Sequence, residues 1–103
     1  MVDTGSECTW VPKRSLEKIG VRREKRLTFA LANGQLVTRS LGFAIVRLGP
    51  HFTTDEIVFA EPGDLLLLGA RTLEGLNVTI DPTAKRVVRA GPRPTGGPIR
   101  IRR

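Results

Sequence analysis

An Asp-Thr-Gly-Ser run near the start of the chain offers the first residue that could do chemistry. The run occupies residues 3–6 of a 103-residue sequence. A carboxylate in a suitable environment can act as a general acid or base on a water molecule. The same residue types are also common in turns and at helix N-termini. Four residues alone leave two interpretations of Asp3 open, a catalytic group and an ordinary turn residue.

Residue types that bind metals or serve as nucleophiles are scarce. His51 is the single histidine and Cys8 the single cysteine, so the sequence predicts no metal site and no cofactor. Cys8 cannot form a disulfide within the chain and is best interpreted as a small core residue. Trp10 has no aromatic neighbour in sequence, which favours packing over base stacking.

Basic residues dominate the charge, and they fall into two clusters. The net charge is +7, one cluster lies between residues 13 and 26, and the second begins at Lys85. No acidic residue follows Asp81. These clusters could attract nucleic acid or an acidic protein through long-range electrostatics. A solvated face with a basic tail is the other interpretation.

The length and the N-terminal composition limit the class of protein. At 103 residues the chain is expected to form one domain. It begins with no apolar run long enough for a signal peptide or a membrane span. With a single cysteine as well, the sequence predicts a cytoplasmic protein that does not contact a membrane.

Local signals in the first half predict a short helix and a long hairpin. Pro12 suits the first turn of a helix over KRSLEKI, and Gly20 can end it in a left-handed conformation. Leu27, Phe29 and Leu31 alternate with smaller side chains before Asn33-Gly34, the segment after it has apolar residues on both faces, and the Asn-Gly pair favours a tight turn. The sequence therefore predicts a β-hairpin over residues 27–48.

The second half reads as short strands separated by turns. Four consecutive leucines indicate a fully buried strand, and the Pro, Gly and Arg content of residues 91–103 indicates a disordered tail. The fold class is mostly β with one or two short helices. The predicted elements are a loop over 50–55, a strand over 56–60, a turn over 62–64, a buried strand over 65–69, a helix over 70–76, a strand around 78–80, a turn over 81–83 and a strand over 86–89.

Taken in order, these features resemble the retropepsin family of aspartic proteases, which includes retroviral proteases and their single-lobe cellular relatives. The resemblance covers about residues 2–90. It implies a retropepsin-like closed β-barrel, the acid protease fold, over residues 1–90, followed by the tail over 91–103. The features that carry it are the Asp-Thr-Gly-Ser run, the hairpin with Asn33-Gly34 at its tip, Leu67-Leu68-Gly69, Leu73 and Ile80-Asp81.

The resemblance implies an aspartic endopeptidase that acts as a homodimer. The chain has one Asp-Thr-Gly motif, so each subunit would supply one Asp3, and the two carboxylates would activate a water molecule. Thr4 would join the two motif loops through its hydroxyl. Gly5 would let the substrate approach the backbone. Ser6 would donate a hydrogen bond to Asp3.

The resemblance also implies a flap that closes over a peptide or protein substrate. The flap would be the hairpin tip formed by Ala32, Asn33 and Gly34. A plain turn is the alternative interpretation of this tip. Leu68 and Gly69 would pack beneath the catalytic loop.

One departure from the family pattern concerns the residues before the motif. Only Met1 and Val2 precede Asp3, whereas the family reaches the motif through a strand, and a strand usually needs about four residues. We therefore expect no lead-in strand and an N-terminally truncated member, or one in which the tail and a partner subunit fill the gap. The alternative function is an inactive protease-like module that uses its basic clusters to bind nucleic acid or an acidic protein.

Overall fold

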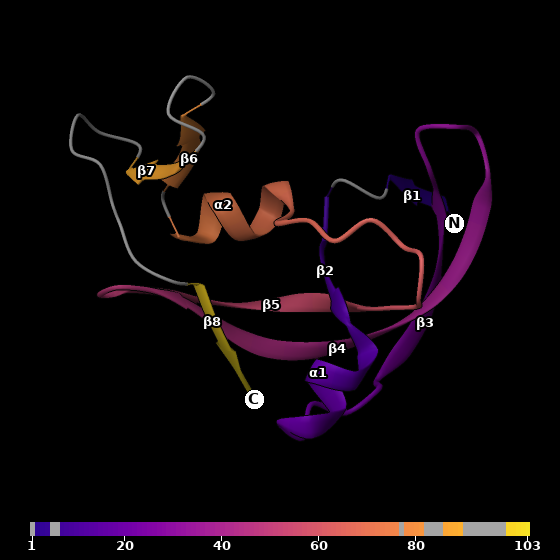
Figure 1. Ribbon diagram of the computed structural model, residues 1–103, viewed down its shortest axis with the longest axis horizontal. Coiled ribbons are helices and arrows are strands. Elements are labelled where there is room, and N and C mark those ends of the chain that lie inside the picture. The colour runs from indigo at the N-terminus through magenta and orange to yellow at the C-terminus, as the bar shows by residue number, and fades with distance from the viewer. Residues whose placement is uncertain (1, 5–6, 77, 82–85, 90–98) are drawn as a thin grey trace.

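The computed structural model describes the backbone of residues 2–4, 7–76, 78–81, 86–89 and 99–103, and the side chains of residues 7–76 and 99–103. Within these ranges the structure is mostly β, with one mixed sheet, a separate two-stranded hairpin and two short helices (Figure 1). No helix in this part of the chain is long and apolar enough to cross a membrane.

The main sheet has six described strands. They are β1 (Val2–Thr4), β2 (Thr9–Pro12), β3 (Lys25–Ala30), β4 (Leu36–Leu48), β5 (His51–Ala60) and β8 (Ile99–Arg102). The sheet is built around the long strand β4: β3 pairs antiparallel with its first half, while β5 and β8 pair antiparallel with its second half. β1 and β2 extend the sheet in parallel, next to β3 and β5 respectively.

This sheet is open among the strands that the structure describes. Its order is β1-β3-β4-β5-β2, with β8 beside β4, so β1 and β2 lie at opposite ends and do not pair. The closed barrel implied by the resemblance is therefore not confirmed. What the structure establishes is a mostly β fold with a mixed sheet and two short helices.

The local predictions for the first half of the chain are confirmed. Helix α1 (Lys13–Lys18) follows Pro12, and Gly20 has a positive φ of 83°. The amide of Val21 donates to the carbonyl of Leu16, which closes the helix. β3 and β4 form the predicted hairpin, and Gly34 at its tip has a φ of 85°.

A strand of three residues contains the start of the motif, and only Val2 of this strand precedes Asp3. Val2–Thr4 form β1, in which Asp3 lies opposite Phe29 of β3. So short a strand is possible because β3 supplies a complete hydrogen-bonding edge that is already fixed by its pairing with β4.

Two predictions for the second half are wrong. Residues 51–55 of the loop expected over 50–55 belong to β5, because Gly49 (φ 57°) and Pro50 make a tight turn directly after β4. The buried strand expected over 65–69 is an irregular segment in which Leu65 and Leu66 are 78% and 55% exposed. Only Leu67 makes a strand-like bridge, to Trp10.

The helix predicted over 70–76 and the strands predicted around 78–80 and over 86–89 are confirmed. They are helix α2 (Ala70–Leu76) and strands β6 (Val78–Asp81) and β7 (Arg86–Arg89), whereas residues 82 and 83 of the turn predicted over 81–83 lie outside the described residues. Within the predicted disordered tail, residues 99–102 form β8, and 91–98 lie outside the described part. β8 forms because Ile99 and Ile101 alternate with arginines and pack against the core.

Two apolar clusters hold the elements together. The first lies between the sheet and helices α1 and α2, and includes Leu16, Val46, Phe59 and Leu76. The second surrounds Trp10, whose ring centroid lies 5.1 Å from that of Phe29. Its other buried members are Cys8, Leu41, Val58 and Ala60, so Cys8 is a core residue as predicted.

Candidate active site

The candidate catalytic motif lies at one end of the main sheet. The backbones of Asp3 and Thr4 belong to β1, and Thr4 lies opposite Ala30 of β3. Gly5 and Ser6, and the side chains of residues 2–4, lie outside what the structure describes. The placement of the motif therefore rests on backbone pairing, which sets it beside the end of β3 that leads into the hairpin turn (Figure 1).

The segment that follows the motif packs against the segment that contains Leu67-Leu68-Gly69. The amide of Trp10 donates to the carbonyl of Leu67 at 2.9 Å, and the amide of Arg71 donates to the carbonyl of Glu7 at 3.1 Å. An ideal Cβ on Gly69 would lie 2.3 Å from the carbonyl carbon of Cys8. At this distance only glycine fits at position 69 without a backbone shift.

Buried hydroxyls reinforce this contact. Thr9 Oγ1 accepts a hydrogen bond from the Gly69 amide at 2.8 Å and lies 2.7 Å from Thr72 Oγ1. The Thr72 hydroxyl donates to Asp55 Oδ2 at 2.9 Å. Because that bond uses the one Thr72 proton, Thr9 is the donor in the Thr9–Thr72 bond. The chain of bonds joins β2, α2 and β5.

The tip of the hairpin is exposed and locally ordered by its own side chains. Asn33 Oδ1 accepts a hydrogen bond from the Gln35 amide at 3.0 Å, which forms an Asx turn. The Leu31 amide donates to the Gln35 carbonyl at 2.8 Å. Ala32, Asn33 and Gly34 are all exposed.

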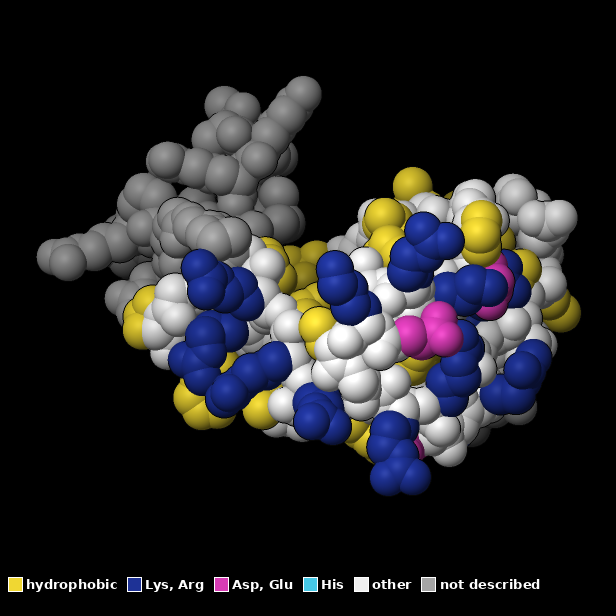
Figure 2. All heavy atoms as spheres, turned by 60° about the horizontal axis from the view of Figure 1, so that its bottom comes forward, with side chains coloured by type: hydrophobic (Ala, Val, Ile, Leu, Met, Phe, Trp, Pro, Cys, Tyr) yellow, Lys and Arg dark blue, Asp and Glu magenta, His cyan; other side chains and the backbone are white. Residues whose placement is uncertain are grey.

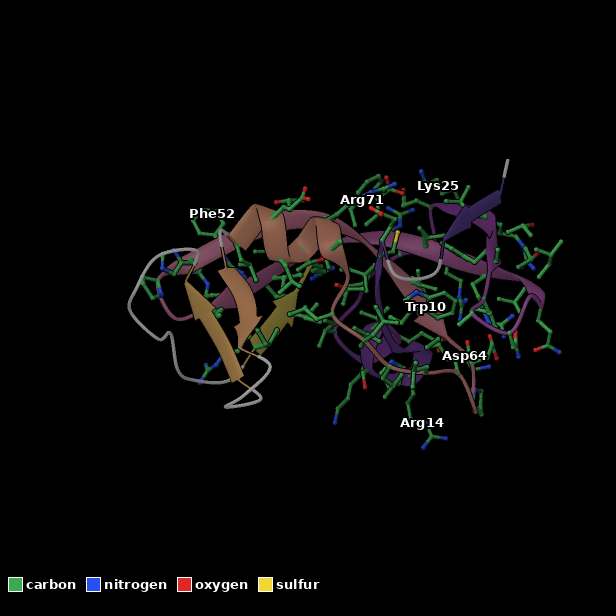
Figure 3. The ribbon with its side chains drawn as sticks, turned by 90° about the horizontal axis from the view of Figure 1, so that it is seen from above. Trp10, Arg14, Lys25, Phe52, Asp64 and Arg71 are labelled. Carbon is green, nitrogen blue, oxygen red and sulfur yellow. The ribbon has the colours of Figure 1, made fainter. Side chains whose placement is uncertain are left out.

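A cleft of about 780 Å³ lies beneath the hairpin. Ala30, Ala32 and Asn33 line it from the hairpin, while Leu65 and Leu67 line the opposite side. Trp10 also lines the cleft, between the hairpin and the segment that carries Asp64 (Figure 3). The cleft is thus largely apolar, and its size is that of a site for a peptide or a small molecule.

An ion pair crosses from the hairpin to the other side of this cleft. Arg39 of β4 donates from Nε and Nη2 to the two carboxylate oxygens of Asp64, at 2.7 and 2.8 Å. The amide of Glu61 also donates to Asp64 Oδ2, at 2.8 Å. The hydrogen bond from Arg39 lowers the pKa of Asp64, and it raises the pKa of Arg39. The pair ties the hairpin to the turn over residues 61–64.

This pair predicts a loss of stability in acid. A carboxyl whose pKa is lowered on folding contributes stability above its unfolded pKa, and that contribution disappears as the pH falls through the lowered folded pKa. We expect Asp64→Asn to reduce the free energy of unfolding by about 1.5–3 kcal/mol at neutral pH, and the difference to shrink as the pH falls below the usual range of aspartate. Urea unfolding of both proteins across the acid range measures it.

The pair between Lys13 and Glu61 provides the matched control. Lys13 Nζ lies 2.6 Å from Glu61 Oε1, but both side chains are 39% exposed. Glu61→Gln should therefore change the stability much less than Asp64→Asn. An Asp64→Asn effect that does not vary with pH would contradict the expected role of the ion pair.

Spacing in the sequence could not identify several of these residues. Thr9, Asp55 and Thr72 meet across different elements, and Arg39 finds Asp64 only once the hairpin has folded. The one available signal was the turn over residues 62–64, which contains Asp64 but does not indicate its partner. Among the described side chains, no group of three or more His, Cys, Asp or Glu could hold a metal ion.

Comparisons with protein-family models, curated proteins and solved structures found no match for the chain.

Proposed function

We propose that the chain is an aspartic endopeptidase of the retropepsin type that hydrolyses peptide bonds as a homodimer. One observation carries the proposal. The Asp-Thr-Gly motif begins on β1, and Thr4 of that strand pairs with Ala30, which lines the cleft beneath the hairpin. The candidate carboxylate therefore belongs to a strand that pairs with β3, and β3 contributes Ala30 to the lining of this cleft.

The packing behind the motif supports the same proposal. A catalytic loop must be held rigidly, because small displacements of reacting groups slow a reaction greatly. The residues that follow the motif are fixed by two backbone hydrogen bonds, by the close contact of Gly69 with Cys8 and by the hydroxyl of Thr9. We propose that the sheet is a retropepsin-like lobe in which these contacts support the Asp-Thr-Gly loop.

In the proposed mechanism two Asp3 carboxylates, one from each subunit, share a water molecule. Two carboxylates at hydrogen-bonding distance cannot both ionise at low cost, so one retains a proton. The ionised Asp3 removes a proton from the water as it attacks the peptide carbonyl carbon. The protonated Asp3 donates to the carbonyl oxygen, and a proton is then passed to the departing amine.

The remaining motif residues and the hairpin have supporting roles in this proposal. Thr4 links the two motif loops, Gly5 allows the substrate backbone to approach, and Ser6 donates to Asp3. Ala32, Asn33 and Gly34 form the flap that covers the substrate and excludes water. The leucines on the opposite side of the cleft suit apolar substrate side chains.

Cleavage of a mixture of quenched fluorescent peptides tests the proposal. We expect the wild-type protein to cleave them between about pH 4 and 7, and Asp3→Asn to lower the rate at least about 100-fold, because it removes the general acid and base. Glu74→Gln, which removes an exposed carboxylate from α2, is the matched control and should remain active. Equal rates for wild type and Asp3→Asn would overturn the proposal, and absence of cleavage by either protein would favour the inactive binding module.

A further inference from the structure

A second surface, separate from the cleft, lies on the outer side of strands β8, β4 and β5. Val46 and Leu48 of β4 point into the core, as do Ile99 and Ile101 of β8. Because side chains alternate along a strand, the intervening residues lie on the opposite face. These outer-face residues are Phe43, Ile45 and Arg47 on β4, Phe52 and Thr54 on β5, and Arg100 and Arg102 on β8.

Arginines on this face lie next to one another. Arg47 is directly opposite Arg100, and the adjacent pair on the same face is Ile45 with Arg102. Like charges in directly opposed positions destabilise a sheet. No ion pair with an acidic side chain is found for these three arginines among the described residues. A bound anion would relieve their repulsion, and the planar guanidinium fork suits phosphate oxygens.

Two exposed aromatic rings share the face with these arginines. Phe52 and Phe43 are 59% and 53% exposed, whereas the other two phenylalanines, Phe29 and Phe59, are fully buried. The Arg47 guanidinium carbon lies 5.0 Å from the centroid of the Phe52 ring. Phe52 of β5 lies opposite Arg47 of β4. Arg47 is four residues along β4 from Phe43, so the two phenylalanines are separated by roughly 14 Å along the strand direction.

The charged surface continues onto helix α1. The Arg103 side chain lies over Gly20, since an ideal Cβ there would be 3.3 Å from it. Arg14, Lys18 and Arg22, in or just after α1, also have no acidic partner among the described side chains. Figure 2 shows this side of the molecule, on which α1 and β8 lie, with many Lys and Arg side chains, hydrophobic side chains among them and few acidic ones.

The outer face also contains one acidic residue. Glu56 lies opposite Phe43, and its Oε2 is 2.7 Å from Lys25 Nζ. The Lys25 charge offsets that carboxylate, so the face keeps its net positive charge.

We propose that this face binds single-stranded nucleic acid. Phosphates contact Arg47, Arg100 and Arg102, and unpaired bases stack on Phe52 and Phe43. Stacking on exposed aromatic rings in a positively charged surface is how many proteins hold single strands. A duplex keeps its bases stacked on each other and cannot use the two rings. An anionic membrane offers phosphates but no aromatic bases to stack on the two rings.

Fluorescence anisotropy with a labelled oligothymidine of about 12 nucleotides tests this site. We expect Arg100→Gln combined with Arg102→Gln to weaken binding about tenfold or more and to reduce the salt dependence by about 1.4 logarithmic units per decade of salt. Phe52→Leu should weaken binding roughly 5- to 100-fold with the salt dependence unchanged. The matched control is Arg26→Gln combined with Arg71→Gln, which removes the same charge from β3 and α2 and should bind like wild type.

Circular dichroism of each variant verifies its fold, and Phe52→Leu tests the site even if the double arginine variant does not fold. An equal loss of binding in the charge-matched control would overturn the proposal, because the binding would then depend on total charge alone. Equal binding of a duplex of the same charge, or binding to phosphatidylserine vesicles without binding to the oligothymidine, would also overturn it. The outcome does not depend on Asp3, so it is independent of the proposed protease activity.

Discussion

Gly69→Ala is expected to lower the stability of the protein by about 3 kcal/mol, near the upper end of the usual cost of an overpacked core. The added Cβ would lie 2.3 Å from the Cys8 carbonyl carbon, 2.5 Å from its oxygen and 2.6 Å from the Glu7 oxygen. All three are backbone atoms, which cannot rotate away as a side chain can. The backbone of residue 69 must therefore move away from the backbone of Glu7 and Cys8.

The same substitution should also disturb the hydrogen bonds around the contact. The Gly69 amide donates to Thr9 Oγ1, and moving the segment would leave buried polar groups without partners. Thermal unfolding is the direct measurement, and a loss of about 3 kcal/mol corresponds to a decrease in Tm of roughly 12–24 °C for a domain of this size.

Gly49→Ala is the matched control for Gly69→Ala. Gly49 lies in the turn between β4 and β5 with a φ of 57°, and nothing lies within 4 Å of its ideal Cβ. Alanine there costs only the left-handed conformation, roughly 1–2 kcal/mol. If Gly69→Ala lowered the stability no more than Gly49→Ala does, the tight contact between Gly69 and the Cys8 backbone would not be important for the stability of the fold.

Elements with strong local signals could be predicted from the sequence. α1 is bounded by Pro12 and Gly20, and the hairpin is specified by alternating residues around Asn33-Gly34. In both cases residues close in sequence decide the backbone conformation, because a fixed or a positive φ is needed at one position.

Elements that depend on distant contacts were predicted less well. The leucines at 65–68 have no periodicity, so nothing in their order indicates that Leu65 and Leu66 are exposed and that Leu67 pairs with Trp10. β8 was not predicted, because residues 91–103 are rich in Pro, Gly and Arg, which is typical of a disordered segment. It forms because β4 has a free edge beyond the end of β3. The candidate motif could be recognised from sequence, whereas the Arg39–Asp64 pair depends on the folded hairpin.

Adding an excess of Asp3→Asn protein to the wild-type protein is expected to suppress most of the proposed peptide cleavage. In the proposed mechanism each active site needs one Asp3 from each of two subunits. Subunit exchange would place wild-type chains in mixed dimers that have one carboxylate and one amide. Such a site lacks half of its acid–base pair, which should cost at least about 100-fold in rate. At a constant total concentration of protein, the activity should fall as the square of the wild-type fraction.

A site contained within one chain predicts a different dependence. Its activity would fall only in proportion to the wild-type fraction, since an inactive neighbour would not affect it. The activity is measured by peptide cleavage, immediately after mixing and again after incubation, so that the effect of subunit exchange can be separated from competition for substrate. An inert protein added at the same concentration is the control, and sedimentation equilibrium of the wild type and of the variant checks that both dimerise. A linear decrease after full exchange would contradict a shared site, because one Asp3 would then be sufficient for catalysis.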